Sequence, residues 1–154
     1  MLSKSHGKMA LLTGTFIMRD AAMAVEGLTT RSSIHGPKET MKRLEAAVKA
    51  RGMTVFARID HAAGAAEVGL PLRPTELLIF GNAKGGTPLM QAIQTIAIDL
   101  PLKALVWQDG ADKTWLAYND PGWIAKRHAL GHEAAAVHAM AGALEALASA
   151  ATTA

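Results

Sequence analysis

The stretch Pro74–Pro101, PTELLIFGNAKGGTPLMQAIQTIAIDLP, decides the fold prediction for this chain. Its first part, Leu77–Phe80, is an unbroken apolar run that ends at Gly81, which is typical of a short strand covered on both faces. Thr87 and Pro88 then suit the N-cap and the first position of a helix, which we expect to end before the closing proline. The stretch therefore predicts a strand, a glycine-rich turn and an apolar helix.

The predicted turn is a candidate ligand site, made of Lys84, Gly85, Gly86 and Thr87. A glycine-rich turn before a helix N-terminus can present free backbone N–H groups to an anion, and the lysine would add positive charge. It is not a Walker A loop, because the lysine precedes the glycine pair and no Gly-Lys-Ser/Thr follows. Two interpretations stay open: an anion- or ligand-binding site, and a tight turn that leads into a capped helix.

The flanking patterns predict one α+β domain over residues 25–148, with an antiparallel sheet of about five strands and helices mainly on one face. The expected order is strand, helix, four strands and terminal helices, with a short helical insertion. Strands are expected at 25–34, 53–61, 77–80, 103–109 and 114–119, and helices at 37–51, 88–98, 123–130 and 133–148. Residues 62–69 are expected to form mainly a loop, and residues 149–154 to fray.

The strand at 53–61 suggests that one sheet face needs a cover. Strict alternation places Val55, Ala57 and Ile59 on one face and Phe56, Arg58 and Asp60 on the other. The face that carries Phe56 lies away from the main helix and is rich in apolar groups. We expect dimerisation or a bound ligand to cover it.

Composition limits the class of protein. At 154 residues, half of them hydrophobic, the chain suits one domain with a sizeable core. It has no cysteine, which excludes disulfides and thiol catalysis. The formal charge is +3, and the basic residues are scattered without a platform of stacked aromatic rings, which argues against nucleic-acid binding.

Residues 1–24 are typical of a signal peptide. Lys4 and Lys8 precede the apolar run Ala10–Met18, and Ala22-Met23-Ala24 fits the small-x-small cleavage pattern. The run is too short to cross a bilayer as a helix, so no transmembrane segment is expected. The segment predicts a periplasmic or secreted protein; the alternative is a disordered or helical arm of a cytoplasmic one.

Two further groups of residues carry alternative functions. Asp60 and His61 end a strand, and with Lys84 or Arg58 they would form an enzyme site; alternatively, they only make local hydrogen bonds. His128 and His132 have the four-residue spacing of two metal or haem ligands on one helix face, although the Gly131 between them can break that helix. No cofactor is required by the sequence.

Several separated motifs resemble one known family. They are Phe56–His61, Ile79–Asn82, Gly86–Met90, Asp99–Lys103, Trp107–Asp109 and Trp115–Pro121. In this order they resemble the domain of unknown function family 302 (DUF302), over most of residues 25–148. The resemblance implies a β-α-β4-α fold related to the TATA-binding protein, frequent homodimers and frequent export, and no established activity. Members often have proline where this chain has Ala83.

The function predicted from these observations is an exported, homodimeric module that binds a small molecule, an anionic ligand or a partner and has no established catalytic activity. Kinship of fold with a DNA-binding protein does not predict DNA binding.

Overall fold

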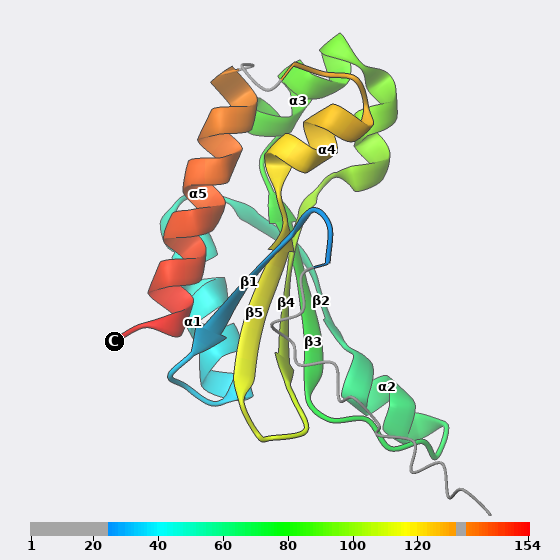
Figure 1. The fold of residues 1–154 in the computed structure, drawn as a ribbon, viewed down its shortest axis with the longest axis vertical. Helices are drawn as coiled ribbons and strands as arrows, with labels where there is room; N and C mark the ends of the chain where they lie inside the picture. The colour runs from blue at the N-terminus through cyan, green and yellow to red at the C-terminus, as the bar shows by residue number, and fades with distance from the viewer. Residues whose placement is uncertain (1–24, 132–134) are drawn as a thin grey trace, which may run out of the picture.

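A computed structural model describes residues 25–131 and 135–154 of the chain. Its centre is one five-stranded antiparallel sheet in the order β1-β5-β4-β3-β2 (Figure 1). The strands are β1 (Leu28–Ser33), β2 (Thr54–Asp60), β3 (Thr75–Gly81), β4 (Leu102–Gln108) and β5 (Thr114–Asn119). The predictions for residues 1–24 and for His132 lie outside the described residues.

The helices form two groups around the sheet. The first group packs side by side against one face and consists of α1 (Pro37–Ala50) and α5 (Ala135–Thr152). The second group gathers at one end of the sheet, beside the N-terminal end of α5 (Figure 1), and consists of α3 (Ala83–Ala92), the 3₁₀ helix η1 (Gln94–Asp99) and α4 (Pro121–Arg127). A short helix, α2 (His61–Glu67), follows β2. The α+β architecture predicted from the sequence is confirmed.

The main core lies between the sheet and the pair α1 and α5. Alternate strand residues point into it, so that Leu102, Ala104 and Val106 of β4 are buried while Lys103 and Leu105 between them are only half-buried. This is the period of two expected of a strand with one covered face. The largest core side chains are Leu78 and Phe80 from β3, Leu116 from β5, Met41, Leu44 and Val48 from α1, and Leu144 and Leu147 from α5.

A second, smaller core joins the helices at the end of the sheet. It is formed by Leu89 of α3, Ile96 of η1, Ile124 and Ala125 of α4, and Val137 of α5. Because each of these helices contributes to it, the end group is a packed unit and not a set of loose connections. Its elements also form part of the candidate site described below.

The strand β3 is fully buried on one face and only half-buried on the other, which corrects the prediction that both faces would be covered. Leu78 and Phe80 have 0 % exposure on the helix face, whereas Leu77 and Ile79 on the opposite face are half-buried. The unbroken apolar run thus reflects a second apolar face that the described helices do not fully cover. We call this second face the open face; its apolar side chains include Ile59, Leu77, Ile79, Leu105 and Trp107.

Strict alternation along β2 is also wrong. The register with β3 shifts between Val55 and Ala57, so a β-bulge puts Val55 opposite Phe80 on the helix face. Arg58, opposite Leu78, shares that face, whereas Ala57 and Ile59 are on the open face. Phe56, in the bulge, is 57 % exposed.

Several element boundaries differ from the sequence prediction, and three of the differences have a clear local cause. The first strand starts at Leu28, since Gly27 adopts a φ of +74° where an added Cβ would lie 2.2 Å from the Trp123 ring. Residues 61–67 form α2 because the Asp60 carboxylate caps it by accepting from the Ala63 amide at 2.9 Å. The predicted fraying from residue 149 is wrong, since α5 continues to Thr152, which is 1 % exposed and whose carbonyl accepts from the Ile34 amide.

Candidate functional site

A pocket of about 690 Å³ opens between α3, α5 and the adjoining ends of the strands. We call it the α3–α5 pocket. Its floor is formed near Gly81 and Leu102, where β3 ends and β4 begins, and residues of η1 and of the loop after it complete the wall. Its volume lies within the roughly 300–1,000 Å³ that small-molecule sites occupy.

The described lining of the pocket is mostly apolar. It contains three methionines, one aromatic ring, alanines on one side of α5 and the chain around the η1–β4 junction: Met53, Phe56, Met90, Ala97, Leu100, Pro101, Leu102, Ala135, Ala136, Ala139, Met140 and Ala143. The polar side chains in the lining are those of Asn82 and Lys84. An apolar hollow with few polar groups is the usual form of a small-ligand site.

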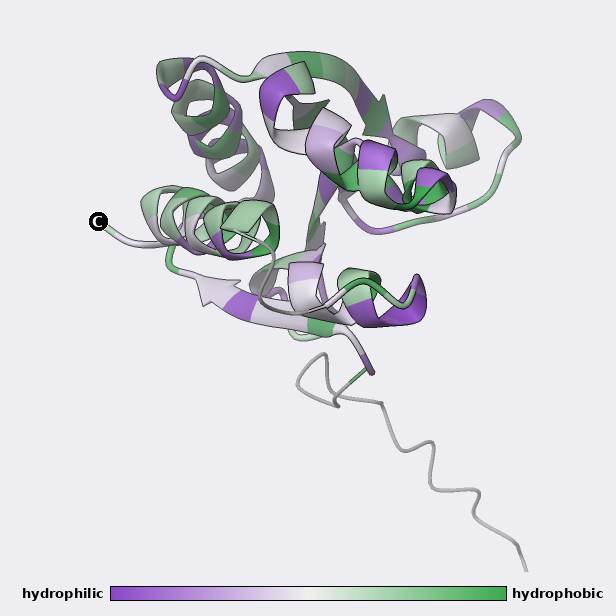
Figure 2. Ribbon diagram, turned by 90° about the horizontal axis from the view of Figure 1, so that it is seen from above, coloured by the Kyte–Doolittle hydropathy of each residue, from purple (hydrophilic) through white to green (hydrophobic). Residues whose placement is uncertain are grey.

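Small side chains explain why the space exists. Where α5 passes α3 it presents alanines to the pocket, and its ribbon is predominantly hydrophobic in colour (Figure 2). On the other side, α3 contributes Gly85 and Gly86. The methionines between them have flexible, unbranched side chains, which adapt to ligands of different shape. The pocket therefore follows from a local shortage of side-chain volume.

The predicted glycine-rich turn is the first part of a helix, which corrects the sequence interpretation. α3 starts after Asn82, whose side-chain oxygen accepts from the Gly85 amide at 2.7 Å, so Thr87 and Pro88 lie inside the helix. The Gly86 amide donates to the Asn82 carbonyl. Two amides that the turn would have offered to an anion are thus already hydrogen-bonded.

The predicted ligand residues nevertheless lie near the pocket. Lys84, Gly85 and Gly86 line it, and Thr87 does not belong to the lining. Ligand binding at these residues remains a prediction.

The groups proposed for an enzyme site do not converge. Asp60 pairs with Glu76 at one end of the β2–β3 ladder, and Lys84 follows Gly81 at the other end. The five steps along the strand from Glu76 to Gly81 span about 17 Å at roughly 3.4 Å per residue. His61 is exposed on α2.

Arg58 is also occupied elsewhere. Its guanidinium forms ion pairs with Glu76 at 3.0 Å and with Glu45 of α1 at 3.0 Å. The hydrogen bond to Glu76 raises the pKa of Arg58, and Lys49 lowers the pKa of Glu45 by a hydrogen bond. Arg58 therefore joins α1 to the sheet edge and does not support chemistry at Asp60.

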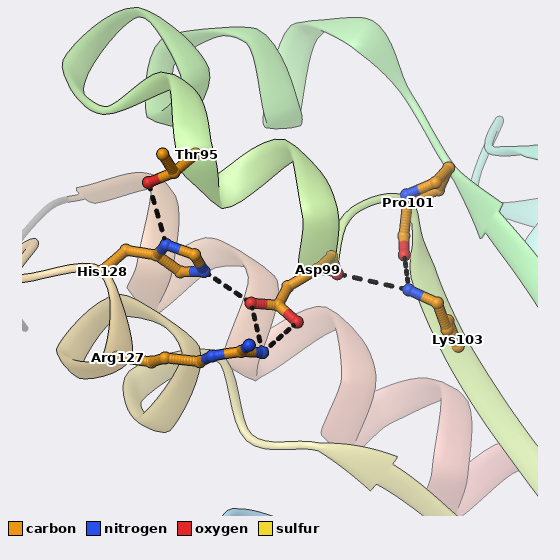
Figure 3. Close-up of polar contacts among 6 residues, drawn as sticks. All are labelled: Thr95, Asp99, Pro101, Lys103, Arg127 and His128. Carbon is orange, nitrogen blue, oxygen red and sulfur yellow. Dashed lines mark hydrogen bonds and ion pairs between the residues drawn. The ribbon is translucent and has the colours of Figure 1, made fainter.

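The structure places His128 in a polar cluster that the sequence did not predict (Figure 3). The ring lies between two side chains of η1: its Nε2 is 2.5 Å from the Asp99 carboxylate, and its Nδ1 is 3.1 Å from the Thr95 hydroxyl. Arg127 donates to the same carboxylate at 2.8 Å. We call these four residues the Asp99 cluster.

The Asp99 cluster fastens α4 to η1. A hydroxyl, an imidazole and a carboxylate in a row can also be the framework of a nucleophilic site. Here, however, the carboxylate is shared with Arg127, and no member of the cluster lines the α3–α5 pocket. Ala97 of η1 lines the pocket. Because the Asp99 cluster fixes η1 to α4, it stabilises this wall of the pocket without contributing to the lining.

In the part of the chain that the structure describes, no further side chains join His128 as metal ligands. α4 ends at Arg127, so His128 is its C-cap residue, and its proposed partner His132 lies outside the described residues. In residues 25–131 and 135–154 there is no group of three or more His, Cys, Asp or Glu side chains that would hold a metal ion.

The two tryptophans of the hairpin mark one end of the open face. Trp107 and Trp115 stack with ring centroids 6.4 Å apart, and the indole of Trp115 donates to Asp109 at 2.8 Å. This hydrogen bond lowers the pKa of Asp109. Tyr118 belongs to the core on the opposite face, as its position in the alternation predicts, and burial raises the pKa of its phenol.

Comparison with known proteins identifies the family. Residues 28–147 match the family described as "Domain of unknown function DUF302". The chain belongs to the DUF302 family. The match confirms the resemblance carried by the sequence motifs, while the kinship with the TATA-binding protein stays a prediction.

Solved and curated relatives add two facts. The fold is similar to that in "Crystal structure of uncharacterized conserved protein DUF302 from Bacillus stearothermophilus", with a TM-score of 0.65 and 21 % identity over 83 % of this chain and 97 % of that one. A stretch of 111 residues, 72 % of this chain, is 54 % identical to proteins named fluoride-specific ion channel FluC 1 from Brucella suis biovar 1 (strain 1330) and FluC 2 from Brucella melitensis biotype 1 (strain ATCC 23456 / CCUG 17765 / NCTC 10094 / 16M).

This chain spans less than half the length of these curated relatives, 44 % of the first and 41 % of the second. None of the helices within the described residues is long and apolar enough to cross a membrane.

Proposed function

We propose that this DUF302 protein is a binding module that holds a small apolar molecule in the α3–α5 pocket. The observation that carries the proposal is the pocket itself, 690 Å³ in volume and lined mainly by methionines, alanines and Phe56. Phe56 is 57 % exposed beside it, so a bound molecule would cover an aromatic surface that now faces solvent.

The affinity expected from such a site is moderate. A ligand of about 20 non-hydrogen atoms that gains roughly 0.3 kcal/mol per atom would bind with about −6 kcal/mol, a Kd of tens of micromolar. This value suits a molecule that exchanges between the protein and its surroundings.

Filling the pocket tests the proposal. The neutral fluorescent probe N-phenyl-1-naphthylamine is titrated into the protein and into the variant Ala139→Trp, whose new side chain takes up pocket volume. The matched control is Ala150→Trp, at an exposed position of the same helix outside the lining. Saturable binding that Ala139→Trp abolishes and Ala150→Trp retains supports the proposal; equal binding by all three proteins contradicts it.

We also propose that the protein is a homodimer whose two copies meet through the open face. The supporting observation is its half-buried apolar row, which includes Leu77, Leu105 and Trp107. The ammonium of Lys103, on the same face, donates to the Asp99 and Pro101 carbonyls. A surface with few free charges can pack against its own copy about a twofold axis without bringing like charges together.

Export is the third part of the proposal, supported by the signal-peptide pattern of residues 1–24. The mass of the protein recovered from its native host tests it. Loss of a segment that ends near Ala24 supports export, and an intact N-terminus in the cytoplasmic fraction contradicts it.

A second function is favoured by the curated relatives. The matched 111 residues belong to proteins named fluoride-specific ion channels, in which a longer stretch remains unmatched by this chain. We propose that this protein works beside such a channel, as an accessory unit to it. A strain that lacks this protein is then expected to become more sensitive to fluoride, and unchanged growth across a fluoride series would contradict the proposal.

A further inference from the structure

The polar side chains in the described lining of the pocket come from the start of α3. Lys84 lies in the first turn of the helix and supplies the one charged side chain in the described lining of the pocket. No ion pair within residues 25–131 and 135–154 uses its ammonium group. A lysine in this position can lay its methylenes along the apolar wall and keep its ammonium at the mouth.

Asn82, the N-cap residue of α3, provides a second donor. Its side-chain oxygen is used by the Gly85 amide at 2.7 Å, which assigns its NH₂ group as the part that remains to donate. Asn82 and Lys84 both line the pocket. An ammonium and an amide NH₂ on one turn suit an acceptor with two oxygens, such as a carboxylate.

The rest of the described lining suits a hydrocarbon. It includes the alanines of α5 together with Met90 and Met140, and no acidic side chain belongs to it. A neutral apolar molecule would fill this part but leave Lys84 without a counter-ion. A cationic one would place like charge beside the ammonium, which is unfavourable.

We propose, building on the ligand-binding function above, that the ligand is a single-chain amphiphile with an anionic carboxylate head. The hydrocarbon chain lies among the methionines and alanines, and the carboxylate accepts from Lys84 and Asn82. The lysine thereby determines which head group the pocket prefers.

A matched set of ligands tests the preference. Dodecanoate, its methyl ester and dodecyltrimethylammonium, each below its aggregation limit, compete with N-phenyl-1-naphthylamine for the protein. We expect dodecanoate to compete about tenfold better than the ester, because a charge-assisted hydrogen bond is lost in the ester. The preference should shrink as salt is added.

Variants of two lysines separate this inference from the function on which it rests. Lys84→Met keeps the length of the side chain but removes the ammonium group, so this variant should bind dodecanoate and its ester equally well. Lys38→Met, at an exposed position of α1 outside the lining, should keep the tenfold preference.

Two kinds of result would contradict the proposals, and they can be told apart. Equal binding of both ligands by the native protein, or a preference that survives in Lys84→Met, would overturn the head-group assignment and leave the apolar pocket in place. Failure of the probe to bind at all, or binding that Ala139→Trp does not reduce, would overturn the ligand-binding function and this inference with it.

Discussion

Replacing Asp99 by alanine is expected to lower the free energy of unfolding by about 2–3 kcal/mol. The carboxylate accepts from the His128 ring at 2.5 Å, where both side chains are 13 % exposed or less. A charge-assisted or shielded hydrogen bond of this kind is worth about 1.5–2 kcal/mol. The bond to Arg127 adds about 0.5–1 kcal/mol, since that guanidinium is 51 % exposed and water screens it.

Urea unfolding followed by tryptophan fluorescence measures this loss. Arg127→Ala is the matched control, with an expected cost of at most about 1 kcal/mol, because it leaves the contact between Asp99 and His128 intact. A double-mutant cycle of Asp99→Ala and His128→Ala should show a coupling energy of about 1–2 kcal/mol.

The same variant should also affect the pocket from a distance. η1 carries both Asp99 and the pocket residue Ala97, so releasing α4 from η1 loosens one pocket wall. Probe binding is expected to weaken although no lining residue has changed. Additive energies in the cycle, or a loss from Asp99→Ala below about 0.5 kcal/mol, would refute the reasoning that the cluster holds η1 in place.

Three further predictions concern the open face, the hairpin and the core. Leu105→Glu, on the open face, should convert the proposed dimer to a monomer in light scattering, whereas a charge at the exposed Ala150 should not; a native protein that is already monomeric would contradict the proposal. Asp109 has a lowered pKa when folded, so its contribution to stability is complete above the ordinary Asp pKa and is lost as the pH falls through the lower folded value. Asp109→Asn should therefore weaken the loss of unfolding free energy at acid pH. An unchanged loss would show that Asp109 does not contribute to the pH dependence of stability. Leu78→Ala, at 0 % exposure, should cost about 2–5 kcal/mol in urea unfolding, and a loss below 1 kcal/mol would show a core less well packed than described.

The sheet was largely predictable because alternation follows from the covalent geometry of a strand. In β4, Leu102, Ala104 and Val106 point into the core, as period two requires, and in β5 Leu116 and Tyr118 do the same. The bulge in β2 was not predictable. It depends on the register with β3, and nothing in the residues around Val55 marks an extra position in the ladder.

The start of α3 was misplaced because two local signals compete. Thr87-Pro88 is a good N-cap and first-turn pair, but Asn82 is equally good and its side chain captures the Gly85 amide. The glycines then belong to the helix despite their low propensity, which tertiary packing against η1 and α5 offsets. The end of α5 was misplaced for a different reason, because the contact of Thr152 with Ile34 joins residues far apart in sequence.

The candidate site was only partly predictable. Lys84, Gly85 and Gly86 were singled out as ligand residues, and they do line the pocket, although as parts of a helix. The wall formed by α5 was not predicted. Its alanines have the pattern of an ordinary helix face, and their distance from α3 is set by tertiary packing, which the local sequence does not show. The contact between Asp99 and His128 spans 29 residues and left no signal in the local sequence.

Methyl NMR of the methionines provides the most direct measurement of the central claim, that the α3–α5 pocket binds a small apolar molecule. Of the four methionines within the described residues, Met53, Met90 and Met140 line the pocket and Met41 is buried in the main core at 0 % exposure. Titration with N-phenyl-1-naphthylamine should shift the first three methyl signals saturably and leave that of Met41 in place. Unmoved pocket methyls at saturating probe, or equal shifts of all four, would contradict the claim.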